Sequence, residues 1–189
     1  MSDKLKDHIE LFGSNHIFIP TKTLKLTGDV DDDMYDIAVV GLHSLDSMTG
    51  PITIKLKSQG GDVDVARAIY DLVRGCKNEV RIQCYGEVAS SASIILQAGD
   101  IRCMSPNSKI MIHVGSEGIP MDHPRNVEKV FEQHRIDEKW IEDIYLSRIK
   151  EKKKRFTRNN LKDIMIWDKF LTPKEALDLG LIDQVGELQ

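Results

Sequence analysis

The sequence of 189 residues lacks the segments that direct proteins into or across membranes. No stretch approaches the roughly 20 consecutive apolar residues that a membrane-spanning helix needs. The N-terminus reads Met-Ser-Asp-Lys-Leu-Lys-Asp-His and has no apolar run of the kind found in signal peptides. We therefore expect a soluble protein located in the cytoplasm.

Cysteine is scarce as well, with three residues at Cys76, Cys84 and Cys103. An odd number without C-x-x-C spacing argues against a disulfide framework. Two of the three lie in apolar, strand-like surroundings, where a free cysteine behaves as a small buried hydrophobe. These residues are predicted to be reduced thiols of the core, which agrees with a cytoplasmic location.

Positive charge is not in excess, because 30 acidic residues against 26 basic ones give a formal net charge of -4. Such a chain has no general electrostatic attraction for nucleic acids or anionic membranes, and we expect neither as a partner. The basic run at 150–155 is interpreted as a solvated helix end beside the negative pole of the helix dipole. A nucleic-acid patch is the weaker alternative for this run.

Strand and helix patterns alternate along the chain and predict an α/β fold. βαβ crossovers of this kind build a mainly parallel sheet. Residues 1–15 are polar and expected to be mobile, whereas 16–189 are predicted to form one domain with a long projecting helix. Strands are predicted at 16–20, 24–26, 52–57, 80–84, 110–113 and 182–185. Helices are predicted at 31–45, 63–73, 91–98, 125–154, 161–166 and 173–179.

Ser90 lies at the start of an apolar helix. In the sequence it follows a strand and a glycine, Gly86, that permits a sharp turn. The N–H groups in the first turn of a helix have no intrahelical partners, and the helix dipole favours negative charge there. A serine in this position can attack a carbonyl carbon while nearby N–H groups receive the developing oxyanion. Taken alone the signal is weak, because serine is a preferred N-cap and the neighbouring Ser91 is a rival nucleophile.

His113 and Asp168 are the candidate partners of such a serine. His113 ends the strand predicted at 110–113 and precedes a loop that contains glycine. Asp168 lies shortly before the helix predicted at 173–179. Taken singly, a structural histidine and a turn-forming aspartate are the commoner explanations, so the two residues gain weight only in combination with Ser90.

Four segments, taken together, resemble motifs of the ClpP peptidase family and occur in the family's order. Gly60-Gly61 and the helix that follows are similar to the glycine-pair loop and helix of these enzymes. Gly86-Glu-Val-Ala-Ser90 resembles G-x-A-A-S, and Pro106-Asn-Ser-Lys-Ile-Met-Ile-His113 matches P-N-S-R/K-I/V-M-I-H. The fourth segment, Asp168-Lys-Phe-Leu-Thr-Pro-Lys-Glu-Ala176 with Gly180-Leu-Ile-Asp183, looks like D-R-F-L-S-x-x-E-A and G-L-I/V-D. The similarity extends over about residues 16–187.

This resemblance implies a serine endopeptidase with a ClpP/crotonase-like fold. Ser90 would be the nucleophile, His113 the general base, and Asp168 the acid that orients the imidazole. The backbone N–H groups of Gly61 and Ser91 would form the oxyanion hole, and glycine at 61 lets a backbone donor approach the substrate closely. The family needs neither a metal nor another cofactor.

The resemblance also implies a self-compartmentalised particle. Seven ClpP subunits form a ring, two rings enclose the active sites, and a hexameric AAA+ unfoldase supplies polypeptide substrates. Residues 1–15 are the candidate axial pore segment. The segment 114–124 departs from the family, whose glycine-rich strand at this place interlocks the two rings. Its two prolines disfavour a regular ladder, which weakens the prediction of a double ring.

Three alternatives stay open on the sequence. A ClpP-like subunit without activity would only build a ring, although such subunits lose triad residues and this chain keeps all three. An enzyme on the related crotonase-like fold would act on an acyl-CoA thioester. A phage-type or plasmid-type protease of the same family would process one dedicated protein.

Overall fold

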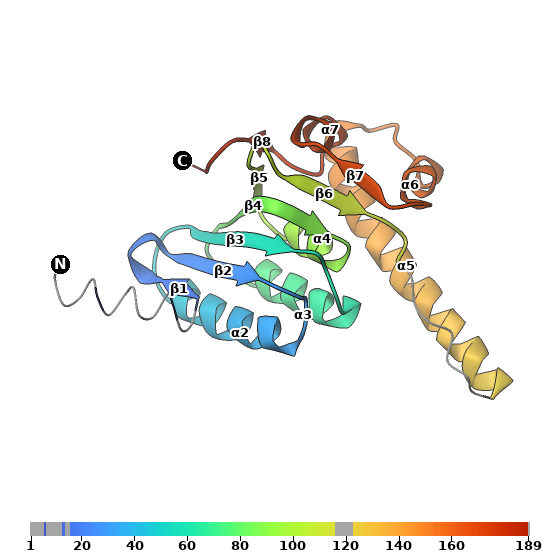
Figure 1. The fold of residues 1–189 in the computed structure, drawn as a ribbon, viewed down its shortest axis with the longest axis horizontal. Helices are drawn as coiled ribbons and strands as arrows, with labels where there is room; N and C mark the ends of the chain where they lie inside the picture. Colours follow the sequence, from blue (N-terminus) through green and yellow to red (C-terminus); the bar gives the residue numbers. More distant parts are fainter. Residues whose placement is uncertain (1–5, 7–12, 14–15, 116–122, 189) are drawn as a thin grey trace.

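The computed structural model of the protein describes residues 6, 13, 16–115 and 123–188. Apart from Lys6 and Gly13, the segment 1–15 and its predicted mobility lie outside the described residues, as does most of 114–124. In the described part of the chain, eight strands form one sheet, accompanied by six α-helices (Figure 1). The strands are β1 (Ile17–Phe18), β2 (Thr23–Thr27), β3 (Ile52–Ser58), β4 (Val80–Ala89), β5 (Ile101–Met104), β6 (Lys109–Ile112), β7 (Lys169–Leu171) and β8 (Gln184–Val185). The α-helices are α2 (Asp32–Asp46), α3 (Val63–Arg74), α4 (Ser91–Leu96), α5 (Pro124–Lys152), α6 (Arg158–Met165) and α7 (Pro173–Leu179), and a short 3-10 helix, η1 (Ile19–Thr21), follows β1.

The sheet is mainly parallel. Strands β2, β3, β4, β5 and β8 lie side by side in this order and run parallel, while β1 joins β2 in the antiparallel direction. Strand β6 is parallel to β4 and antiparallel to β7. Helices α2, α3 and α4 pack next to one another against the sheet (Figure 1). The predicted α/β fold with a mainly parallel sheet is confirmed.

Strand β4 is longer than predicted and changes partners half-way. Its first half pairs with β5, and its second half, from Glu87 to Ala89, pairs with β6. Gly86 lies between the two halves with a φ of 61°, and the register with β3 shifts there. The predicted turn at Gly86 was therefore wrong: the glycine bends a continuous strand, as in a β-bulge, and that strand continues to the residue before Ser90.

Strands β5 and β7 were not predicted. In β5, Arg102 interrupts the apolar pattern, yet its side chain is buried. Its guanidinium donates two hydrogen bonds, of 3.0 and 2.7 Å, to the two carboxylate oxygens of Asp183. Strand β7 has only three residues, too few for an alternating pattern to be recognised.

Helix α5 has 29 residues and confirms the predicted helix at 125–154 to within two residues at each end. Its C-terminal part buries Ile144, Tyr145 and Ile149 in the core. Its N-terminal part projects beyond the body of the domain and exposes Phe131 and Ile136 (Figure 1). One helix thus supports the interior and also presents apolar side chains at the surface.

The cysteines are free thiols, as predicted. Cys84 and Cys103 are buried, whereas Cys76 is partly exposed. Burial raises the pKa of Cys76 to about 11, so this thiol stays protonated near neutral pH. Among the described helices, none has both the length and the apolar character that crossing a membrane requires.

Candidate active site

Side chains from three separate segments meet at one edge of the sheet. Ser90 follows β4, His113 follows β6, and Asp168 precedes β7, which runs antiparallel to β6. Ser90 Oγ lies 2.8 Å from His113 Nε2, and His113 Nδ1 lies 3.0 Å from Asp168 Oδ1. A neutral imidazole in this position accepts a hydrogen bond from the hydroxyl at Nε2 and donates one to the carboxylate from Nδ1. The structure therefore brings together the three side chains that the sequence singled out.

The backbone of Ser90 is held in a conformation that is rare for a residue with a side chain, with φ 52° and ψ -129°. The Ser90 N–H donates a 2.9 Å hydrogen bond to the carbonyl oxygen of Met111, and all six residues of α4 behind it are buried. Gly60 approaches so closely that a Cβ there would lie 2.7 Å from the Cβ of Ser90. The Ser90 hydroxyl is therefore positioned by the core of the domain.

The Ser90, His113 and Asp168 side chains form a hydrogen-bonded line, and its carboxylate end is much less buried than its hydroxyl end. The side chain of His113 is 21 % exposed, and that of Asp168 is 62 % exposed. The pairing of Lys169 with Ile112 between β7 and β6 brings Asp168 beside His113. Backbone pairing, rather than burial, therefore places Asp168.

Two backbone N–H groups next to Ser90 were predicted to form an oxyanion hole. Gly61 forms an isolated bridge with Val30, but its own N–H takes no part in that bridge. A Cβ at position 61 would collide with the carbonyl oxygen of Val30, so the close approach requires glycine. As far as the structure describes the chain, the N–H groups of Gly61 and Ser91 donate no hydrogen bond and are free to bind a ligand oxygen. Their role as oxyanion donors stays a prediction.

Ser91, the rival nucleophile, has a different environment. Its Oγ is buried and has no hydrogen-bond partner among the residues that the structure describes. Ser90 Oγ, in contrast, has an imidazole nitrogen at hydrogen-bonding distance. Because a serine hydroxyl needs an adjacent base to become a nucleophile, the geometry favours Ser90.

A pocket of about 320 Å³ opens beside Ser90 and His113. Gly61 also lines it, as do carboxylates from the start of α3. One face of α5 closes the pocket. The sequence did not predict that the residues of this face line a site, although their spacing of three or four residues would have marked them as one helix face. The α5 residues are His134, Asp137, Glu138 and Ile141. The described residues contain no group of three His, Cys, Asp or Glu side chains that could hold a metal ion.

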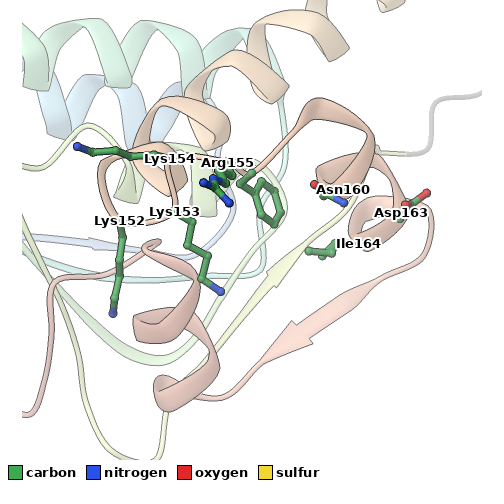
Figure 2. Close-up of a pocket in the computed structure, with 8 residues that line it drawn as sticks. Lys152, Lys153, Lys154, Arg155, Asn160, Asp163 and Ile164 are labelled. Carbon is green, nitrogen blue, oxygen red and sulfur yellow. The ribbon is translucent and has the colours of Figure 1, made fainter.

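A larger hollow of about 800 Å³ lies at the C-terminal end of α5. Figure 2 shows its basic side chains spreading in different directions around it, with Asn160, Asp163 and Ile164 on the opposite side. None of the five predicted site residues lines this hollow. Residues 150–155 are all exposed, as expected for a solvated helix end.

Comparison with known proteins shows what the chain is similar to. Residues 11–189 match the family model described as Clp protease. The chain is 35 % identical, over 160 residues, to an ATP-dependent Clp protease proteolytic subunit of Deinococcus radiodurans, and the match covers 82 % of this chain and 76 % of that protein. A solved structure of a ClpP1 point mutant from Listeria monocytogenes superimposes with a TM-score of 0.78 at 25 % identity, covering 90 % of this chain and 94 % of that chain. The chain belongs to the Clp protease family.

Proposed function

We propose that this Clp-family protein is a serine endopeptidase whose nucleophile is Ser90. One observation carries the proposal, namely the continuous line from Ser90 Oγ through His113 to Asp168 at the mouth of a pocket. The two unengaged N–H groups of Gly61 and Ser91 add a site for negative charge beside that line. A hydroxyl, its base and two donors are the parts that acyl transfer needs.

In the acylation step, Ser90 Oγ attacks the scissile carbonyl carbon and His113 Nε2 takes the hydroxyl proton. The carbonyl oxygen becomes an oxyanion, which the N–H groups of Gly61 and Ser91 stabilise. When the carbon–nitrogen bond breaks, His113 gives its proton to the leaving amine and an ester of Ser90 remains. Asp168 accepts a hydrogen bond from Nδ1 throughout and stabilises the imidazolium.

Water completes the cycle by the same route. His113 takes a proton from a water molecule whose oxygen attacks the ester carbonyl, and the same two N–H groups hold the second oxyanion. Ester cleavage returns the proton to Ser90 Oγ and releases the new carboxyl terminus. No step uses a metal or a cofactor.

For the whole particle, residues 16–189 act as one peptidase domain, and seven copies form a ring that pairs with a second ring in the cytoplasm. Unfolded chains and short peptides are the substrates, a hexameric AAA+ unfoldase is the partner, and residues 1–15 line the axial pore. The name of the Deinococcus relative, ATP-dependent Clp protease proteolytic subunit, supports the parts of this proposal that concern a proteolytic subunit and an ATP-dependent partner. Exposed apolar side chains at Phe131 and Ile136 on α5 supply surface for contacts between copies.

The test is hydrolysis of short fluorogenic peptides by the purified particle, whose mass is measured in parallel. Ser90→Ala and His113→Ala should each abolish hydrolysis without changing the mass of the particle, whereas Ser44→Ala on the exposed face of α2 should have no effect. Full hydrolysis by Ser90→Ala would overturn the proposal. No hydrolysis by an intact wild-type ring would indicate a silent subunit. Cleavage of acyl-CoA thioesters alone would indicate a crotonase-type enzyme, and cleavage of one protein at one site would indicate a dedicated processing protease.

A further inference from the structure

Two buried hydroxyl groups behind the nucleophile are not used by the mechanism above. Ser93 lies on α4 and Tyr145 lies on α5, and both side chains are fully buried. Ser93 Oγ is 2.6 Å from Tyr145 Oη and 2.6 Å from the carbonyl oxygen of Ser90. A hydrogen-bonded line therefore runs from the long helix to the backbone of the nucleophile.

The direction of this line is determined by proton counting. A serine hydroxyl carries one proton, and Ser93 donates that proton to the carbonyl oxygen of Ser90. Ser93 Oγ must then accept its second hydrogen bond, so Tyr145 is the donor. Burial raises the pKa of Tyr145 well above the usual value for a phenol, which keeps the donor proton in place. The order is Tyr145 hydroxyl to Ser93 hydroxyl to Ser90 carbonyl.

The carbonyl at the end of this line shares a peptide group with a proposed oxyanion donor. The C=O of Ser90 and the N–H of Ser91 belong to the same planar trans unit, and they point in opposite directions. The Ser93 N–H also donates to that carbonyl, at 2.9 Å. Two donors on the carbonyl oxygen therefore fix the plane of the peptide and, with it, the direction of the Ser91 N–H.

Hydrogen bonds in a chain also polarise one another, by about 10–30 % per bond. Electron density drawn towards the Ser90 carbonyl oxygen makes the Ser91 N–H of the same peptide a stronger donor. This gain is largest when the acceptor is an oxyanion, because charge-assisted hydrogen bonds are about twice as strong as neutral ones. It therefore stabilises the transition state more than the bound substrate.

We propose that Tyr145 and Ser93 are positioning residues that aim and polarise the Ser91 N–H of the oxyanion hole, so that α5 takes part in catalysis through the backbone of α4. This inference rests on the proposed function, in which Ser90 is the nucleophile. The same contacts could merely tie α4 to α5. In that case their removal would lower the stability of the protein without a selective effect on the transition state.

The test uses Tyr145→Phe, Ser93→Ala and the double variant in the full-length particle. Because the Ser91 N–H remains in place, the loss should be smaller than the 10²–10³-fold cost of removing a donor, and we expect kcat to fall about 5- to 10-fold with KM unchanged. Affinity for a peptide aldehyde, which forms a tetrahedral adduct with Ser90, should fall by the same factor. The double variant should be no slower than Ser93→Ala, because Tyr145 acts only through Ser93.

Tyr35→Phe is the matched control, since it removes a phenol hydroxyl on α2, away from this line. It should leave kcat and aldehyde affinity at wild-type values. Particle mass and melting temperature are measured for every variant, and if Tyr145→Phe fails to assemble, Ser93→Ala gives the same test.

The inference is overturned if the folded variants keep wild-type kcat and aldehyde affinity, or if only their melting temperatures change. Failure of the proposed function looks different. In that case the wild-type particle itself neither hydrolyses peptides nor forms an adduct at Ser90.

Discussion

The two ends of the candidate catalytic line are built in different ways. At one end, Ser90 is held by a strained backbone, by pairing with β6 and by a wholly buried α4. At the other end, the side chain of Asp168 is 62 % exposed, and the preceding residue, Trp167, is 80 % exposed. The same site therefore joins a hydroxyl that the core positions to a carboxylate that the core leaves open.

This difference shows which part of the site the single chain completes by itself. The hydroxyl and the two N–H groups depend on packing within the domain, so each chain carries them ready-made. The carboxylate directly follows Ile166 and Trp167, two exposed apolar residues. We expect that assembly with further copies covers this end and orders Asp168.

The largest effect is expected at the Ser90 end, from Gly60→Ala. The added Cβ would meet Ser90 Cβ at 2.7 Å and the Ser91 nitrogen at 3.2 Å, so the proposed nucleophile and the proposed oxyanion donor should both shift. Peptide hydrolysis should fall at least as far as for loss of one oxyanion donor, about 10²–10³-fold. Gly50→Ala is the control, because Gly50 also has a positive φ, of 97°, but nothing within 4 Å of the added Cβ. If peptide hydrolysis fell by the same factor in both variants, backbone strain alone would explain the effect.

A smaller loss is expected at the open end, from Asp168→Asn. Replacement of a buried triad aspartate by asparagine costs about 10⁴-fold in kcat, because the histidine tautomer changes. Asp168 is solvated, so water can take over part of its role, and we expect about 10²-fold, measured as kcat on a short peptide. Asp178→Asn, on the exposed side of α7, should keep full activity. A loss equal to that of Ser90→Ala would show that both ends are equally fixed.

Asp183→Asn should lower stability more than it lowers activity. Burial raises the pKa of Asp183, but the hydrogen bonds and charge of Arg102 outweigh this and bring the pKa below 3.8. Breaking a buried ion pair costs about 3–5 kcal/mol. Because the Asp183 side chain is 39 % exposed, we expect about 2 kcal/mol by chemical denaturation.

The lowered pKa of Asp183 also predicts how the free energy of unfolding changes with pH. A carboxylate with a lowered pKa contributes stability above its unfolded value of 3.8 and loses that contribution as the pH falls through the folded value. The wild-type protein should therefore lose more unfolding free energy than Asp183→Asn between pH 5 and pH 2. Parallel curves for the two proteins would show that the Arg102–Asp183 pair does not contribute.

The smallest effect concerns the pocket between the two ends. Asp62, Asp137 and Glu138 line it, so a basic side chain on the peptide should be preferred to an acidic one. An exposed ion pair is worth about 0.2–1 kcal/mol, which corresponds to a preference of about 1.4- to fivefold in kcat/KM for lysine over glutamate peptides at low salt. Glu138→Gln and 1 M salt should each reduce the preference. An unchanged preference in both cases would place substrate outside this pocket.

The sequence predicted the fold where local patterns are strong. The alternation at β3 and the helical spacing in α5 placed these elements to within two residues. β4 was predicted too short because its second half exchanges one neighbouring strand for another at Gly86, and such an exchange depends on contacts between distant segments. β5 was not predicted because it contains a charged residue, Arg102. Its burial is possible because Asp183, 81 residues later in the sequence, neutralises the charge.

The site was predicted in part. Motif order located Ser90, His113 and Asp168, and the structure places their side chains in contact, while their catalytic roles remain proposals. The α5 face at the pocket and the Tyr145–Ser93 line were not predicted. Both depend on how α5 packs against α4, and that packing cannot be derived from the periodicity of either helix.

Labelling with a fluorophosphonate tests most directly whether His113 activates the Ser90 hydroxyl. Mass spectrometry of the assembled particle should show one adduct per chain, located on Ser90, with no adduct in Ser90→Ala and labelling at least 10²-fold slower in His113→Ala. An adduct on Ser91, or equally fast labelling of Ser90 without the imidazole, would contradict the account.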